Sequence, residues 1–220
     1  MKHNDENYIP ALSYDWLTFL YDPVVRLTTR ETAFKAALLA QARIQSDQHV
    51  LDLACGTATL TIAIKQAYPQ ANVVGIDGDP TILQQAWAKA QRVGVEIRLD
   101  EGLSYELPYI DASFDRVLSS LFFHHLTQEN KQRTLAEVWR VLKPGGEFHV
   151  ADWGTPQNRF MRLASQGIVS LDGPTTKDNF DGLLLEFIRQ AGFANVQETG
   201  HFNTLFGTIR LHRALKPRDH

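Results

Sequence analysis

The sequence predicts a single α/β domain with a mostly parallel sheet and helices on both of its faces. Residues 50–64 have the pattern of a buried strand, a turn of small residues and the start of a helix. A second apolar run, residues 73–76, follows after about one helix length, as in a βαβ unit. The chain has 220 residues, which suits one domain of this kind with a sizeable core.

Composition and charge exclude several classes of protein. Hydrophobic residues make up 44% and charged residues 21%, values typical of a globular domain. The single cysteine, Cys55, excludes an intrachain disulfide. The net charge is −3 and the basic residues do not cluster, which argues against a nucleic-acid partner. A polar N-terminus without a cleavable signal, and the lack of an apolar run near 18 residues, predict a cytoplasmic protein without a transmembrane segment.

The turn after the first strand has the residues of a ligand site. It contains Ala54, Cys55 and Gly56, which are small enough for a ligand to approach the backbone. The helix that follows has free N–H groups at its start, and these point toward whatever the turn binds. We therefore expect the main ligand to lie at this turn.

A carboxylate at the end of the second strand identifies the ligand as a nucleoside. Asp77 lies 21 residues after Gly56, close to the spacing between a glycine turn and a ribose-binding acid. Gly78 and Asp79 follow directly. Asp79 precedes Pro80, so it is expected to cap the next helix.

The choice of nucleoside depends on Asp52 and on the glycine count. A dinucleotide fingerprint has three glycines, whereas this turn has only Gly56. Asp52 would disfavour a pyrophosphate but could accept from the ammonium group of an amino acid. Ribose together with an amino acid indicates S-adenosylmethionine. A nicotinamide-dependent oxidoreductase is the weaker alternative, and a non-catalytic module that binds S-adenosylmethionine remains open.

Three later segments join this turn in a family resemblance. They are Asp115-Arg-Val-Leu-Ser-Ser, Phe123-His-His-Leu and Glu137-Val-Trp-Arg-Val-Leu-Lys-Pro-Gly-Gly-Glu-Phe. From about residue 49 to residue 153 the chain resembles the class I S-adenosylmethionine-dependent methyltransferases, in the branch that contains the menaquinone and ubiquinone C-methyltransferases. The resemblance implies a Rossmann-like sandwich with a seven-stranded, mostly parallel sheet whose last strand is antiparallel. It also implies S-adenosyl-L-methionine as the cofactor and a small-molecule methyl acceptor. Candidate contacts of Gly78 and Asp79 with the nucleoside are implied by this resemblance alone.

The remaining helices and strands are predicted from their hydrophobic patterns and from the residues that end them. Helices are expected at 29–42, 57–66, 80–92, 128–142 and 178–191, and strands at 95–99, 114–120, 147–151, 193–198 and 206–213. Within one domain of residues 1–220 we expect a helical cap (1–46), a cofactor-binding core (47–153), a candidate lid (154–177) and a C-terminal helix with a strand hairpin (178–220). The segment 154–177 fits either a mobile lid or a static insertion.

The third strand departs from the pattern of the family. Its relatives carry Gly-Asp-Ala where this chain has Gly102, Leu103 and Ser104, and Leu103 cannot accept a hydrogen bond from the adenine amino group. We expect backbone carbonyls and Ser104 to accept the hydrogen bond from the adenine amino group instead. The alternative is that Asp100 or Glu101 accepts it from a shifted loop.

Candidates for the acceptor side follow the fourth and fifth strands, because ligands bind at the carboxyl ends of strands in open α/β sheets. His124 is the candidate general base, although a histidine is more often structural than catalytic, even at this place. Ser119 and Ser120 are candidate cofactor contacts, and Tyr14, Tyr21, His125 and Trp153 are candidate substrate contacts, the two tyrosines from the resemblance alone.

The chemistry expected at this site needs mainly placement. Methyl transfer from a sulfonium requires an acceptor held in line with the methyl carbon, so an apolar or aromatic acceptor needs few catalytic groups. No Cys and His residues have the spacing of metal ligands, and Cys55 is expected to pack in the turn.

Overall fold

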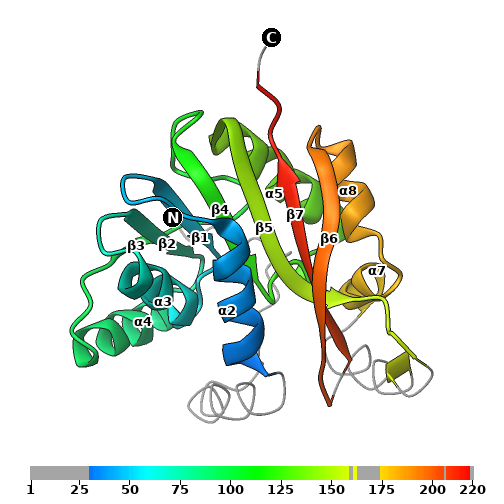
Figure 1. Ribbon diagram of the computed structural model, residues 1–220, viewed down its shortest axis with the longest axis horizontal. Helices are drawn as coiled ribbons and strands as arrows, with labels where there is room; N and C mark the ends of the chain where they lie inside the picture. Colours follow the sequence, from blue (N-terminus) through cyan, green and yellow to red (C-terminus); the bar gives the residue numbers. More distant parts are fainter. Residues whose placement is uncertain (1–29, 159–160, 163–173, 206, 219–220) are drawn as a thin grey trace, which may run out of the picture.

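The computed structural model describes residues 30–158, 161–162, 174–205 and 207–218. Its centre is a seven-stranded sheet with the order β3-β2-β1-β4-β5-β7-β6 (Figure 1). The strands are β1 (His49–Leu53), β2 (Asn72–Asp77), β3 (Arg98–Glu101), β4 (Phe114–Ser120), β5 (Leu142–Gly154), β6 (Ala194–Asn203) and β7 (Thr208–Leu215). Strands β1 to β5 are parallel, while β7 is antiparallel to both β5 and β6. The predicted sheet with an antiparallel last strand is confirmed.

Helices cover both faces of the sheet, as the sequence predicted. The helices α2 (Glu31–Ala42), α3 (Thr59–Ala67) and α4 (Pro80–Arg92) lie on one side, and α5 (Gln128–Val141) and α8 (Leu184–Gln190) lie on the other (Figure 1). Alternate strand residues point to opposite faces, so Val50 packs into the core beneath α2 while Leu51 packs into the core beneath α5. A parallel sheet covered in this way is apolar on both faces.

Strand β5 is longer than the sequence predicted. The sequence predicted this strand at 147–151, but the strand already begins at Leu142. Gly145 N–H donates to the carbonyl of Lys216 and the N–H of Lys216 donates to the carbonyl of Gly146, so the chain pairs alongside the end of β7 there. Strand β3 begins later than predicted because the turn around Gly94 closes α4, with the N–H of Val95 donating to the Ala90 carbonyl.

The helix predicted at 178–191 is two helices. The short α7 (Lys177–Phe180) ends before Gly182, whose φ of +80° interrupts the helical path, and α8 begins at Leu184. A residue with a Cβ adopts this conformation only at a cost, so glycine favours the break there.

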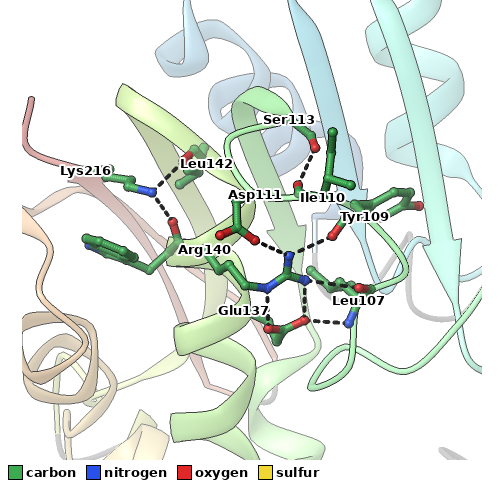
Figure 2. A network of polar contacts seen from close by, with 10 residues as sticks. Leu107, Tyr109, Ile110, Asp111, Ser113, Glu137, Arg140, Leu142 and Lys216 are labelled. Carbon is green, nitrogen blue, oxygen red and sulfur yellow. Dashed lines mark hydrogen bonds and ion pairs between the residues drawn. The ribbon is translucent and has the colours of Figure 1, made fainter.

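The loop between β3 and β4 is held by an arginine of α5. Figure 2 shows Arg140 donating to the carbonyls of Leu107 and Tyr109 and to the carboxylates of Asp111 and Glu137, at 2.7 to 3.1 Å. Glu137 in turn accepts from the N–H of Leu107 at 2.7 Å. The motif at residues 137–148 therefore fixes the loop that starts at the carboxyl end of β3.

Candidate functional site

The turn after β1 has an unusual backbone. Gly56 has a φ of +54°, and the two alanines beside it, Ala54 and Ala58, also have positive φ values of 55° and 58°. Each left-handed alanine costs roughly 1 to 2 kcal/mol. The N–H of Cys55 donates to the Ile76 carbonyl at 2.9 Å, which ties the turn to β2. Strain of this kind is concentrated at binding and catalytic sites.

Asp77 connects this turn with the ends of β2 and β3. Its carboxylate accepts from the N–H of Gly56 at 2.8 Å and from the N–H of Asp79 at 3.1 Å. Its backbone carbonyl accepts from the N–H of Gly102 at 3.0 Å. Burial raises the pKa of the carboxyl, although the Gly56 and Asp79 N–H groups oppose the rise. The structure thus brings Asp77 and Gly56 together, as the spacing predicted.

The next residues form one edge beside Asp77. A Cβ added to Gly78 would lie 3.3 Å from the Leu103 side chain and 3.7 Å from the Gly102 carbonyl. Gly78, Gly102 and Leu103 are therefore neighbours at the carboxyl ends of β2 and β3.

Asp52 is a fully buried carboxylate beneath the turn. It is 1% exposed, and Thr61 of α3 donates to it at 2.6 Å. Burial raises its pKa to about 6, against the hydrogen bond from Thr61 and the charge of Lys35 on α2, while the charge of Asp77 adds to the rise. Two carboxylates that repel one another therefore face the same small turn.

Cys55 has the packing role that the sequence predicted. The residue is 7% exposed, and a Cβ on Gly75 would lie only 3.0 Å from its sulfur. Burial, followed by the charges of Asp52 and Asp77, raises the pKa of the thiol far above its usual range. A thiol that stays protonated is a poor nucleophile.

Asp79 caps α4. Its side chain accepts from the N–H groups of Thr81 and Ile82 at 2.8 and 3.3 Å, with Pro80 at the first helical position. This arrangement confirms the predicted cap, and a contact with the nucleoside stays a prediction.

The three candidate serines occupy different environments. Ser119 is buried at the end of β4 and donates to the Leu53 carbonyl at 3.1 Å. Ser120, the last residue of β4, is partly buried. The hydroxyl of Ser104 lies 2.9 Å from that of Thr134 on α5, so it is already paired within the core. Its predicted contact with adenine would require this pair to open.

His124 pairs with a carboxylate that the sequence analysis did not select. Its Nδ1 lies 2.6 Å from Oδ1 of Asp152, and the two residues are 3% and 0% exposed. Asp152 also accepts from the N–H groups of Phe122, His124 and Trp153. Burial opposes its ionisation, but the charge and hydrogen bond of His124 outweigh burial and lower the pKa of Asp152. Because a carboxylate only accepts, Nδ1 of His124 carries a proton in this pair, and Nε2 is the basic nitrogen when the imidazole is neutral.

Aromatic rings surround this pair. The His125 ring lies 3.9 Å from the His124 ring between centroids, Trp153 lies 6.4 Å from His124, and Phe180 of α7 lies 6.2 Å from Trp153. Burial, and then the charge of His124, lowers the pKa of His125 to about 3, so His125 is neutral near pH 7. The structure brings together His124, His125 and Trp153, while Tyr14 and Tyr21 lie outside the described residues.

The sequence of this chain is similar to those of known methyltransferases. A family described as a methyltransferase domain matches residues 50–146. An uncharacterized methyltransferase of Synechocystis is 33% identical over 150 residues, which cover 67% of this chain and 68% of the relative. The chain belongs to the class I S-adenosylmethionine-dependent methyltransferases. The predicted enzyme class and the predicted cofactor, S-adenosyl-L-methionine, are confirmed at the level of this family.

Two further comparisons concern a curated relative and a solved structure. A demethylmenaquinone methyltransferase of Deinococcus radiodurans is 37% identical over 126 residues, 57% of this chain and 52% of the relative. The match therefore spans about half of that curated relative. A solved S-adenosylmethionine-dependent methyltransferase of Methanosarcina mazei shares the fold with a TM-score of 0.66 at 19% identity, over 82% of this chain and 98% of that one.

The residues that sequence reasoning missed act through other residues. Asp152 was visible beside Trp153 at the end of β5, but nothing in the sequence indicates that it faces His124 across two strand ends. Lys131 of α5 is 0% exposed, and its ammonium donates to the Thr175 carbonyl and to Asp178 at 2.7 and 3.2 Å.

In the described part of the chain, no helix is both long and apolar enough to span a bilayer.

Proposed function

We propose that this methyltransferase binds S-adenosyl-L-methionine across the carboxyl ends of β1 and β2 and transfers its methyl group to a small hydroxylated aromatic acceptor. A hydroquinone is the acceptor class that we favour. The cytoplasmic location of the protein stays a prediction. Support for the acceptor class comes from the demethylmenaquinone methyltransferases among the relatives and from the aromatic residues beside His124. Such a ring is apolar on its faces and polar at its oxygen atoms.

The proposal that S-adenosyl-L-methionine binds here rests mainly on the negative charge at the turn after β1. Asp52 is buried and Asp77 is partly buried, and burial raises the pKa of each. A ligand with a cationic ammonium and a cationic sulfonium would relieve this repulsion, whereas a pyrophosphate would increase it. The same argument disfavours the nicotinamide alternative. Asp77 is the proposed ribose acceptor, and Asp52 would face the ammonium of the methionine part directly or through water.

The His124–Asp152 pair supports the acceptor half. Asp152 holds Nδ1–H of His124, so Nε2 is available to accept the proton of an acceptor hydroxyl. When bound, S-adenosyl-L-methionine would supply the methyl group. After the hydroxyl proton moved to Nε2 of His124, a ring carbon of the acceptor would form a bond to the methyl carbon while the bond between the methyl carbon and sulfur broke. The methylated ring carbon would then lose its proton to solvent as His124 returned its proton to the oxygen, which would restore the aromatic hydroquinone.

Placement supplies most of the remaining rate. The sulfonium is already activated, so an acceptor carbon about 3 to 3.5 Å from the methyl carbon and in line with the leaving sulfur needs little further assistance. Trp153 and Phe180 are proposed to hold the faces of the ring.

Two measurements test the proposal. Calorimetry with S-adenosylhomocysteine should show saturable binding, and no binding at about millimolar ligand would remove the cofactor assignment. Transfer of labelled methyl from S-adenosylmethionine to 1,4-dihydroxynaphthalene, kept reduced under nitrogen, should require His124. Cofactor binding without transfer to any of a broad panel of phenols and hydroquinones would favour the non-catalytic module instead.

A further inference from the structure

Two buried polar side chains near the segment that contains His124 have no hydrogen-bond partner among the described residues. Thr176 and Asn179 are 0% and 1% exposed. Within the part of the chain that the structure describes, the hydroxyl oxygen of Thr176 and both polar atoms of the Asn179 amide are unpaired. Buried polar groups are normally paired, since leaving one unsatisfied is costly, so this pair of residues needs an explanation.

Their position connects them with the acceptor half of the site. Thr176 ends the short helix η3 (Pro174–Thr176), and Asn179 lies in α7. Both elements pack against η2 (Phe123–His125), which contains His124, and α7 also packs against β5. Phe180, the residue after Asn179, contacts Trp153.

A buried lysine holds this segment in place. The ammonium of Lys131 donates to the carbonyl of Thr175 and to the carboxylate of Asp178, the residues that precede Thr176 and Asn179. The same ammonium attracts Asp152 electrostatically. The fold therefore fixes the backbone beside both polar side chains and leaves the side chains themselves unpaired.

We propose that Thr176 and Asn179 bind a second oxygen atom of the acceptor, while His124 binds the first. This inference rests on the proposed function. A hydroxyl and a carboxamide can each donate and accept, which suits a phenolic hydroxyl that does the same. The preferred acceptor would then be an aromatic ring with two oxygen substituents rather than one, and Asn179 with Thr176 would determine that preference.

The test uses two probes that differ in one hydroxyl, 1,4-dihydroxynaphthalene and 1-naphthol. We expect the wild-type protein to prefer the first by about tenfold or more in kcat/KM, as for one well-placed hydrogen bond. Asn179→Leu and Thr176→Val should remove most of this preference by weakening only the dihydroxy probe. Both variants should retain or raise the melting temperature, because each removes an unpaired buried polar group.

A matched control is Thr134→Val, which removes a buried hydroxyl that is paired with Ser104. This variant should lower the melting temperature and leave the ratio between the two probes unchanged. Equilibrium binding of both probes in the presence of S-adenosylhomocysteine gives a second readout that does not require turnover.

The outcomes separate this inference from the proposed function. If the wild type methylates both probes equally well, or if Asn179→Leu weakens both probes alike, the inference is overturned and the proposed function stands. If neither probe binds while S-adenosylhomocysteine does, the hydroquinone class is overturned and the inference with it.

Discussion

We predict that Asp52 makes the protein less stable at neutral pH, because burial raises the pKa of its carboxyl. Its folded-state pKa of about 6 lies above the ordinary value of 3.8. Between these two values the folded state binds a proton that the unfolded state has lost, so stability falls as the pH rises through this window. A difference of about two pKa units corresponds to a destabilisation of the order of 3 kcal/mol once the carboxyl is ionised in both states.

The variant Asp52→Asn removes this charge and keeps an oxygen that can accept from Thr61. Urea unfolding without cofactor should show the variant to be more stable than wild type by about 3 kcal/mol near pH 7.5 and little different near pH 4. The affinity of the variant for S-adenosylhomocysteine should fall, because the ammonium would lose its carboxylate. Wild-type affinity should also weaken as the pH falls below about 6, and this dependence should disappear in the variant.

Asp115→Asn is the matched control with the opposite sign. Burial disfavours the charge of Asp115, but Lys143 and the N–H of His49 outweigh burial and lower its pKa. Removing that charge should therefore reduce stability near neutral pH. If Asp52→Asn were as destabilising as Asp115→Asn, the account of Asp52 as an uncompensated buried charge would be refuted.

Three more predictions concern single side chains. Asp77→Ala should weaken S-adenosylhomocysteine binding by roughly 1.5 to 3 kcal/mol in calorimetry with the fold retained, and unchanged affinity would place the ribose elsewhere. Asp152→Asn should slow turnover by about 10²- to 10⁴-fold, because the proton of His124 is no longer held on Nδ1. Binding of S-adenosylhomocysteine should stay the same. Full activity of this variant in a methyl-transfer assay would mean that His124 has only a packing role. Burial lowers the pKa of His212 to about 4, so only the unfolded state takes up its proton between about pH 6.5 and 4, and stability should be lost as the pH falls through that range. His212→Gln should show less of this loss in urea unfolding, and an identical pH profile would contradict the assignment.

The parts of the fold that follow from local pattern were predictable. The apolar runs at β1 and β2 predicted buried parallel strands, and Asp79 with Pro80 predicted the start of α4 at the observed residue. One error lies where pairing between distant residues decides the structure. Strand β5 begins early because Gly145 and Gly146 pair with Lys216, which is far away in the sequence.

The same limit applies to the candidate site. Gly56 and Asp77 were predictable because one βαβ unit sets their spacing, and the structure joins them by a hydrogen bond. The contact of His124 with Asp152 links η2, which follows β4, to β5, and the pairing of β4 with β5 brings the two residues together. Burial decides the rest, since neither the raised pKa of Asp52 nor the unpaired amide of Asn179 can be seen in a sequence.

A crystal structure with S-adenosylhomocysteine bound is the measurement that tests the central claim most directly. The account predicts the ribose hydroxyls within hydrogen-bonding distance of the Asp77 carboxylate, the ammonium of the amino-acid part toward Asp52, and the sulfur on the side of His124. A ribose bound away from Asp77, or a turn at Gly56 closed to the ligand by protein atoms, would contradict it.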